Sequence, residues 1–235
     1  MNTSIIARKS IENRSRKAMS NSQVGTYKFE AFPFHLDVRG KLSMGVLGKH
    51  LLNCADAYAA ERGFDVVEQG GEHYTWVLSR LAIELEDLPS CHESFSIQTW
   101  VENVYRLFAD RNFVICNKDE KPIGYVRSVW AMISMETRNP ANLLDLHGDR
   151  ITNSICEKEC PIAKPGRIKV SQQEAVSEYV AKYSDLDING HVNSIKYIEH
   201  ILDIFPLDIY KKKALKRFEI AYVAESYYGD TLCFY

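Results

Sequence analysis

The chain has 235 residues, of which 46% are hydrophobic and 26% charged, and its 29 basic and 31 acidic residues give a formal net charge of −2. This composition is typical of a globular protein and excludes a collagen-like repeat, a low-complexity disordered chain and a disulfide-stapled small domain. No run approaches the roughly 20 apolar residues that span a membrane, and none resembles the apolar core of a secretion signal.

Charge is distributed unevenly along the chain. Residues 1–23 carry five basic side chains against Glu12, and subtracting these six from the totals leaves 24 basic and 30 acidic residues, a net charge of −6. The five are Arg8, Lys9, Arg14, Arg16 and Lys17. We expect residues 1–23 to form a flexible leader, with Met19 as an alternative start, although the segment also resembles an organellar transit sequence. The acidic remainder argues against nucleic acid as a ligand, because phosphate binding needs a basic face.

The six cysteines have irregular spacings, and several lie in apolar runs where cysteine behaves as a small hydrophobic residue. This usage predicts free thiols in a reducing, cytoplasmic compartment. Cys156 and Cys160 form one close pair but lack the second pair of cysteines or histidines that a zinc site needs, so we interpret them as loop residues. No metal or cofactor is expected.

The predicted elements follow the same order twice. An alternating strand at residues 26–37 leads through a glycine-containing turn to an amphipathic helix and its connection at 43–72. Further alternating strands are predicted at 74–86, 94–108, 111–116 and 123–135, with a polar hairpin turn at 117–123. A strand at 167–183, a second glycine-containing turn and a shorter helical region between Val192 and Lys216 repeat the pattern.

The repeat is visible in the residues themselves. Leucine, aspartate and glycine coincide when residues 36–42 are set beside residues 186–192, an offset of 150. A second offset, of 137, places residues 80–83 on residues 217–220. A helix that covers an antiparallel sheet, formed twice, is an α+β architecture.

The expected organisation is a leader at residues 1–23, an N-terminal half at 24–136, a proline-containing linker at 137–166 and a C-terminal half at 167–235. The first copy continues to Met135, well beyond Glu93. The second ends five residues after Asp230, which is the position equivalent to Glu93. We therefore expect the C-terminal half to be incomplete.

Polar residues concentrate at residues 183–197, where a predicted strand meets a helix. The free N–H groups and the positive dipole end of a helix start favour negative charge on a substrate oxygen. Asn189 can donate from its amide and His191 can donate or transfer a proton, both beside Gly190, which permits close approach of a ligand. The alternative interpretation of this stretch is helix capping, and we interpret Asp185 as a turn or cap residue.

The first copy provides an internal control for this motif. Arg39 and Lys41 stand where the second copy has Asn189 and His191, while leucine, aspartate and glycine are retained. A residue needed only for capping or packing would be kept in both halves. The replacement therefore favours a chemical role for Asn189 and His191.

Glu225 shows the same asymmetry. It follows the predicted strand at residues 218–224, and its counterpart in the first copy is Leu88. The difference favours a functional carboxylate in the second half. The alternative is a solvated carboxylate at a strand end.

Residues 183–197 resemble the strand-to-helix signature of hot-dog-fold thioesterases, and the double copy resembles the acyl-acyl carrier protein thioesterases of fatty-acid synthesis. The similarity extends from Thr26 to Tyr235. It includes Thr75-Trp-Val-Leu-Ser-Arg80, Gln98-Thr-Trp-Val101, Ser128-Val-Trp-Ala-Met132 and Thr137-Arg138. The resemblance implies a tandem hot-dog fold, in which each half wraps a long helix in an antiparallel sheet and the N-terminal half binds the acyl chain.

The resemblance also implies catalysis by Asp187, Asn189, His191 and the downstream acid Glu225. Many plant members have a cysteine directly after this acid, whereas this chain has Ser226, which favours attack by water over a cysteine nucleophile. In this interpretation Glu225 is the general base, Asn189 holds the carbonyl or the water, and His191 aligns the water or assists departure of the thiolate. Asp187 orients these groups or shares the role of base.

The implied function is hydrolysis of fatty acyl-acyl carrier protein to free fatty acid, by a cytoplasmic monomer or homodimer. The helix residues expected to wall the acyl tunnel are Val46, Leu47, Leu51, Leu52, Ala55 and Tyr58. The dense basic run outside the leader consists of Lys211, Lys212, Lys213, Lys216 and Arg217. It would attract the acidic carrier protein, although a solvated charged loop also explains it.

Three alternatives use the same fold: a coenzyme A thioesterase, a non-catalytic module that senses acyl thioesters, and a dehydratase. Retention of Asn189, His191 and Glu225 in one copy alone favours catalysis over sensing. Dehydratases on this fold use a different arrangement of histidine and acid, as the resemblance implies.

Overall fold

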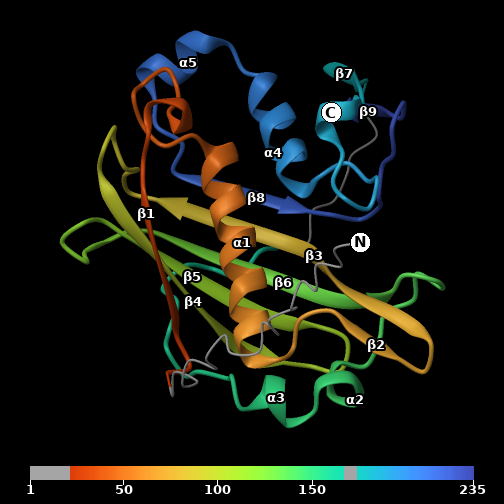
Figure 1. Cartoon of the computed structure of the whole chain (residues 1–235). Coiled ribbons are helices and arrows are strands. Elements are labelled where there is room, and N and C mark those ends of the chain that lie inside the picture. The colour runs from red at the N-terminus through yellow and green to blue at the C-terminus, as the bar shows by residue number, and fades with distance from the viewer. Residues whose placement is uncertain (1–21, 167–173) are drawn as a thin grey trace, which may run out of the picture.

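The computed structural model describes residues 22–166 and 174–235 (Figure 1). Nearly all of the expected leader at residues 1–23 lies outside the described residues, as do the first seven residues, 167–173, of the expected C-terminal half. Among the described residues, no helix is both long enough and apolar enough to cross a membrane.

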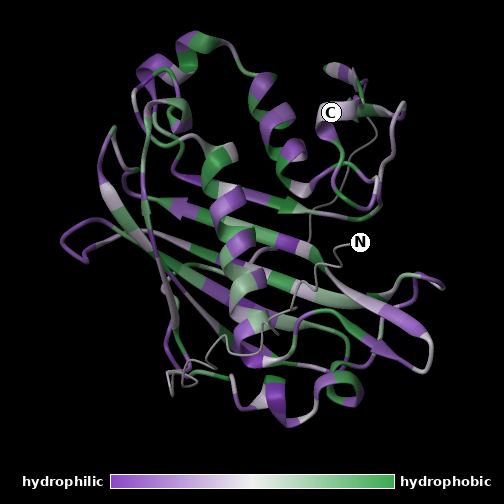
Figure 2. Ribbon diagram, viewed as in Figure 1, coloured by the Kyte–Doolittle hydropathy of each residue, from purple (hydrophilic) through white to green (hydrophobic). Residues whose placement is uncertain are grey.

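The N-terminal half is built on one curved antiparallel sheet, on which a long helix lies (Figure 1). Its elements are β1 (Gly25–Glu30), η1 (Pro33–His35), α1 (Met44–Arg62), β2 (Val67–Gln69), β3 (Glu72–Leu85), β4 (Ser94–Val104), β5 (Ala109–Cys116) and β6 (Pro122–Ser134). The strand order is β1-β4-β5-β6-β3-β2, and a strand of the C-terminal half, β8 (Arg217–Ala221), also pairs with β3. Figure 2 shows apolar residues along the strands beneath α1 and polar residues at the outlying β2–β3 hairpin.

Helix α1 begins where the Ser43 hydroxyl accepts a hydrogen bond from the Val46 N–H, at 3.3 Å. Leu47 and Leu51 are completely or almost completely buried and pack into the main core with Ile97 and Phe113 of the sheet. The amphipathic pattern thus places one face of the helix on the sheet, and burial of this apolar surface stabilises the half.

The first predicted strand is too long. Residues 26–37 were expected to be extended throughout, but β1 ends at Glu30 and the chain turns into the 3₁₀ helix η1. Pro33 lacks the N–H that a continuing ladder needs and suits the first position of a helical turn. The same correction applies to residues 167–183, because the described part contains only β7 (Ser177–Val180), followed by η2 (Tyr183–Asp185).

The C-terminal half has the same order of elements in a smaller form. It contains β7, η2, α4 (Ser194–Asp203), α5 (Leu207–Lys212), β8 and β9 (Thr231–Phe234), and β7 pairs with β9 in a two-stranded sheet. Its main helix has 10 residues against 19 in α1. Pro206 follows closely and cannot continue the helix, so the chain restarts as α5.

A local two-fold relationship connects the two halves. β3 and β8 pair antiparallel, and Ala82 lies opposite Glu219, its own counterpart at the offset of 137. Helices α1 and α4 also lie side by side (Figure 1). A Cβ atom on Gly48 of α1 would lie 2.6 Å from the Cδ1 atom of Ile195 on α4, so glycine permits the close approach of the two helices. The structure confirms the α+β, tandem hot-dog architecture.

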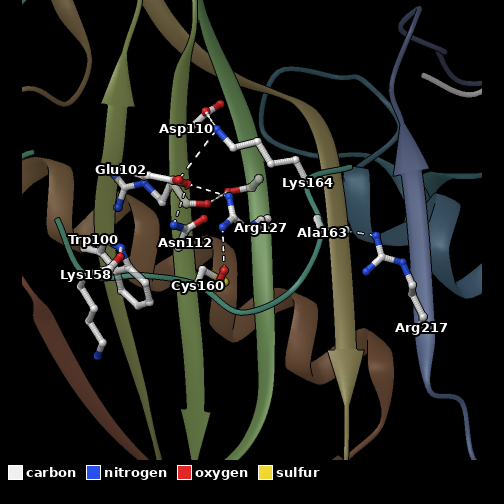
Figure 3. Close-up of polar contacts among 12 residues, drawn as sticks. Trp100, Glu102, Asp110, Asn112, Arg127, Lys158, Cys160, Ala163, Lys164 and Arg217 are labelled. Atoms are coloured by element: carbon white, nitrogen blue, oxygen red, sulfur yellow. Dashed lines mark hydrogen bonds and ion pairs between the residues drawn. The ribbon is translucent and has the colours of Figure 1, made fainter. Parts of the chain in front are cut away.

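Residues 137–166 contain two short helices, α2 (Leu143–His147) and α3 (Asp149–Thr152), and then cross the sheet face opposite α1 (Figure 3). The Trp100 indole donates to the Lys158 carbonyl at 2.9 Å, and Arg127 donates to the Cys160 carbonyl at 2.6 Å. Lys164 forms an ion pair with Asp110 at 2.7 Å. These contacts fix the segment to the outer face of the sheet and leave the α1 face for the site.

Candidate active site

A cavity of about 310 Å³ lies where the N-terminal half meets the turn before α4. The N-terminal half contributes mostly apolar side chains to its wall, from α1 and the strands of the sheet. The C-terminal half contributes the polar residues Asp187, Asn189, His191 and Glu225. The structure therefore brings all four sequence-predicted site residues to one cavity.

The turn that carries three of these residues is held by its aspartate. One carboxylate oxygen of Asp187 accepts hydrogen bonds from the N–H groups of Asn189, at 2.8 Å, and His191, at 3.1 Å. Gly190 has a φ of 79°, in the left-handed region that favours glycine. Asp187 thus fixes the backbone from which the Asn189 and His191 side chains project.

The same turn recurs in the first half without the functional side chains. Asp37 accepts from the N–H groups of Arg39, at 2.8 Å, and Lys41, at 3.3 Å, and Gly40 has a φ of 71°. The arginine also forms an ion pair with Asp37, at 2.6 Å. The backbone geometry is therefore common to both halves, and the amide and imidazole occur only in the second.

Helix capping is performed by another residue. The Asn193 side chain accepts a hydrogen bond from the Ile195 N–H, at 2.9 Å, at the start of α4. The amide of Asn189 and the imidazole of His191 are thus not needed as caps. Asp185, the predicted turn residue, is buried in η2 and accepts hydrogen bonds from the Lys182 N–H and the Tyr179 hydroxyl, both at 2.8 Å.

The side chains of His191 and Glu225 lie next to each other in the cavity wall. The imidazole Nδ1 lies 3.7 Å from the Oε1 atom of Glu225, and the His191 side chain is 16% exposed. The ring of Tyr227 packs edge-on against the imidazole, with 5.0 Å between centroids. The Val192 N–H donates to the Ser226 carbonyl at 2.8 Å. These contacts hold the turn against the segment that follows β8.

Glu225 has a partner that the sequence reasoning missed. Arg138, from the turn after β6, donates to the Oε1 atom of Glu225 in an ion pair, and both side chains line the cavity. The two residues are 87 positions apart, so spacing gave no signal of the contact. The one signal for Arg138 in the sequence is the Thr137-Arg138 pair, which belongs to the family resemblance.

The apolar wall uses a narrower part of α1 than predicted. Of the six helix residues expected to line it, Leu52 and Ala55 do so, and Asp56 and Ala59 complete the stripe. The others lie elsewhere on the helix. Residues at spacings of three and four share one side of a helix, which explains why the stripe runs through positions 52, 55, 56 and 59.

Arg111 of β5 brings a cation to the same wall. Its side chain is buried, its Nη1 atom has no hydrogen-bond partner among the described residues, and its guanidinium lies over the Tyr58 ring, 4.6 Å from the centroid. Burial lowers the pKa of Arg111 to about 10. The guanidinium remains charged at neutral pH and is stabilised by the aromatic face.

The basic run is smaller than its sequence indicates. Arg217 is paired with both Glu84 and Glu219, and Lys216 donates to the Glu86 carbonyl at 3.2 Å. The four lysines of the run are exposed, and Lys211 forms an ion pair with Asp208 at 3.7 Å, which leaves Lys212 and Lys213 without an acidic partner among the described residues. Lys211, Lys212 and Lys213 lie on or next to α5, which follows the C-terminal end of α4 (Figure 1). The cavity adjoins the N-terminal end of α4.

The fold and the cavity define a class of protein: a tandem hot-dog protein with an acid, an amide and an imidazole on one wall of an apolar cavity. The family description "Acyl-ACP thioesterase N-terminal domain" matches residues 23–148, and "Acyl-ACP thioesterase C-terminal domain" matches residues 168–234. The chain belongs to the acyl-ACP thioesterase family.

Solved structures agree with this assignment. An acyl-ACP thioesterase from Bacteroides thetaiotaomicron is 60% identical, with a TM-score of 0.84 over 92% of this chain and 87% of that one. The 12:0-ACP thioesterase from Umbellularia californica shares the fold at 17% identity, with a TM-score of 0.75 over 90% of this chain and 81% of that one.

Curated relatives are more distant and longer. A palmitoyl-acyl carrier protein thioesterase of Gossypium hirsutum is 24% identical over 221 residues, which cover 89% of this chain and 54% of that protein. An oleoyl-acyl carrier protein thioesterase of Arabidopsis thaliana is 29% identical over 67% of this chain and 46% of that protein. The chain thus spans about half the length of these relatives.

Proposed function

We propose that this protein hydrolyses the thioester of fatty acyl-acyl carrier protein and releases the free fatty acid. The observation that carries the proposal is the meeting, in one cavity, of apolar residues from the N-terminal half with Asn189, His191 and Glu225 from the C-terminal half. An apolar wall suits an acyl chain, and the polar group suits a carbonyl and a water. Membership of the family supports the same substrate class.

In the proposed mechanism Glu225 is the general base. It takes a proton from a water molecule while the water oxygen bonds to the thioester carbonyl carbon. The carbon–sulfur bond then breaks, and His191, 3.7 Å from Glu225, supplies a proton to the departing thiolate. Asp187 is assigned to positioning, because its carboxylate already accepts two backbone hydrogen bonds in the turn.

The carbonyl oxygen becomes negatively charged in the transition state and needs donors. Asn189 lines the cavity, and its amide is assigned as one donor. Asn193 and Ser194, at the start of α4, line the same cavity, so the positive end of the helix dipole lies near the developing charge. Ser226 is not needed as a nucleophile in this mechanism.

The decisive experiment incubates the full chain with acyl carrier protein loaded with acyl groups of eight to eighteen carbons and measures free fatty acid. Release that depends on Glu225 supports the proposal. The same acyl groups on coenzyme A test the alternative carrier. Tight binding of acyl thioesters without any release would identify a sensing module instead.

The proposal extends to the domains, the carrier contact, the location and the oligomeric state. We propose residues 24–136 as the acyl-binding half, 137–166 as the connection and 167–235 as the catalytic half. The carrier protein would contact Lys211, Lys212 and Lys213. The six free thiols fit a cytoplasmic location. A chain in which two hot-dog units already pair can act as a monomer, and a homodimer is the alternative that a mass measurement in solution would detect.

A further inference from the structure

Arg138, at the start of the segment that connects the two halves, contacts a proposed catalytic residue of the C-terminal half. Its guanidinium contacts the Oε1 atom of Glu225, the same oxygen that lies 3.7 Å from the His191 Nδ1 atom. The side chains of Arg138 and Glu225 are each 35% exposed. A cation, a carboxylate and an imidazole therefore form a chain of contacts along the cavity wall.

The backbone of Arg138 is held in an unusual conformation. Its φ of 59° is in the left-handed region, which few residues other than glycine adopt. The Arg138 N–H donates to the Ser134 carbonyl at 2.9 Å, and the Thr137 N–H donates to the Ser134 hydroxyl at 3.1 Å. The Met135 sulfur also accepts from the guanidinium, at 3.6 Å. The turn after β6 thus fixes the position from which the guanidinium reaches Glu225.

Taking Glu225 as the proposed general base, we infer that Arg138 is its positioning residue. The cation fixes one carboxylate oxygen and the direction of the group toward His191, and it favours the ionised form that can accept a proton. It also offsets the negative charge of Glu225 near a carbonyl oxygen that is itself becoming negative. The segment that connects the two halves would therefore serve catalysis as well as linking them.

The pH dependence of activity is one readout of this role. Other titratable or charged groups on the cavity wall are Asp56 of α1, Arg111 of β5, Asp187 and His191 of the turn, Tyr197 of α4 and Tyr222 after β8. Replacement of Arg138 leaves these groups in place. A carboxylate that has lost its cation is harder to keep ionised, so the acidic limb of kcat/KM should move to higher pH in Arg138→Gln.

A double-mutant cycle separates positioning from an independent effect. The variants are Arg138→Gln, Glu225→Gln and the pair together, with Arg106→Gln, an exposed arginine in the turn between β4 and β5, as the control. We expect Arg138→Gln to lower kcat about tenfold to a hundredfold with little change in KM, because a misplaced reacting group costs this much. In the Glu225→Gln background the Arg138 change should have no further effect. Arg138→Lys should recover part of the loss.

Each other outcome overturns the inference. Effects of the two single changes that multiply in the double variant would mean that Arg138 acts independently of Glu225. An unchanged pH profile in a folded Arg138→Gln variant would also contradict it, and Arg138→Lys provides a second variant if Gln disturbs folding. Full activity in Glu225→Gln would instead remove the proposed base, and the inference with it. Slow turnover in Glu225→Gln beside normal turnover in Arg138→Gln would overturn only the inference.

Discussion

The Asn193 side chain caps α4 by accepting from the Ile195 N–H at 2.9 Å, as the Ser43 hydroxyl caps α1 at the equivalent position of the first half. In both halves, therefore, a side-chain oxygen of the N-cap residue accepts a backbone N–H at the start of the helix. The side chain of Asn189, four residues earlier, is thus not needed as a cap, and Asn189 lines the cavity.

Replacement of these two asparagines should separate stability from chemistry. Asn193→Ala is expected to lower the free energy of unfolding by about 1 kcal/mol, because a cap is lost. Asn189→Ala is expected to leave stability almost unchanged. It should lower kcat about a hundredfold, because a donor to the carbonyl oxygen is lost. Urea unfolding and steady-state kinetics on both variants measure the two effects. Equal activity losses in the two variants would contradict the division of roles.

Glu225→Gln should lower turnover of acyl-acyl carrier protein at least about a hundredfold, since a positioned general base contributes about 10²–10⁴. The matched control is Ser226→Ala, the adjacent residue, which should keep most of the activity. Free fatty acid release under saturating substrate measures both. Loss of all activity in Ser226→Ala would point to a nucleophile at that position.

Two substitutions of Asp187 test whether it is a positioning residue or the general base. The Asp187→Asn side chain retains an oxygen that can accept from the Asn189 and His191 N–H groups, so the turn should persist and kcat should fall by less than about tenfold. Asp187→Ala should lose the turn geometry and most of the activity. A decrease in Asp187→Asn as large as that in Glu225→Gln would transfer the role of base to Asp187.

The buried carboxylate of Asp185 should make stability depend on pH. Although burial opposes ionisation, hydrogen bonds from the Lys182 N–H and the Tyr179 hydroxyl and the nearby His200 ring hold the pKa of Asp185 below its ordinary value. The ionised form is therefore favoured in the folded state. Its contribution is fully present above the unfolded pKa of about 3.9 and is lost as pH falls through the lower folded value.

Asp185→Asn tests this dependence. It should lower the free energy of unfolding at pH 7 by about 2 kcal/mol, because a buried hydrogen-bonded charge is removed, and the difference from the unmodified protein should shrink below about pH 4. Asp203→Asn, an exposed aspartate at the end of α4, is the control and should have little effect. Urea titrations at several pH values measure the difference. A constant difference across this range would exclude titration of Asp185 as its cause.

Particular residues show which features of the structure could be predicted from the sequence. The turn at residues 186–192 was predictable because the chain repeats its leucine, aspartate and glycine at 36–42, and both glycines adopt the left-handed φ that this turn requires. Arg138 was not assigned a role, because its contact with Glu225 depends on how β6 and the end of β8 meet in space. No spacing along the chain encodes that contact.

Which residues of α1 line the cavity also could not be predicted from the sequence. Periodicity identified the apolar face of α1 correctly, but Leu47 and Leu51 are core residues, whereas Leu52 and Ala55 line the cavity. Which part of an apolar face meets a sheet and which part meets a cavity depends on the placement of the neighbouring elements. Hydrophobicity is the same for both, so the pattern alone cannot separate them.

Charge reversal on α5 tests the proposed contact with the acidic carrier protein. Changing Lys211, Lys212 and Lys213 to glutamate should raise KM for acyl-acyl carrier protein several-fold at low salt, since complementary charge mainly speeds association. The effect should diminish as salt screens the interaction over a Debye length of about 8–10 Å. Lys118 and Lys121, in the turn between β5 and β6, provide the control reversal.

Comparing acyl carrier protein with coenzyme A shows whether the effect of these lysine variants is specific to the protein carrier. The KM for the same acyl group on coenzyme A should change less, because a small carrier at the cavity need not contact α5, which lies beyond the C-terminal end of α4, a helix about 15 Å long. The kcat values should be unaffected, because none of these lysines lines the cavity. An unchanged KM for the acyl-acyl carrier protein would mean that the carrier docks elsewhere, and that the lysines on α5 form only a solvated face.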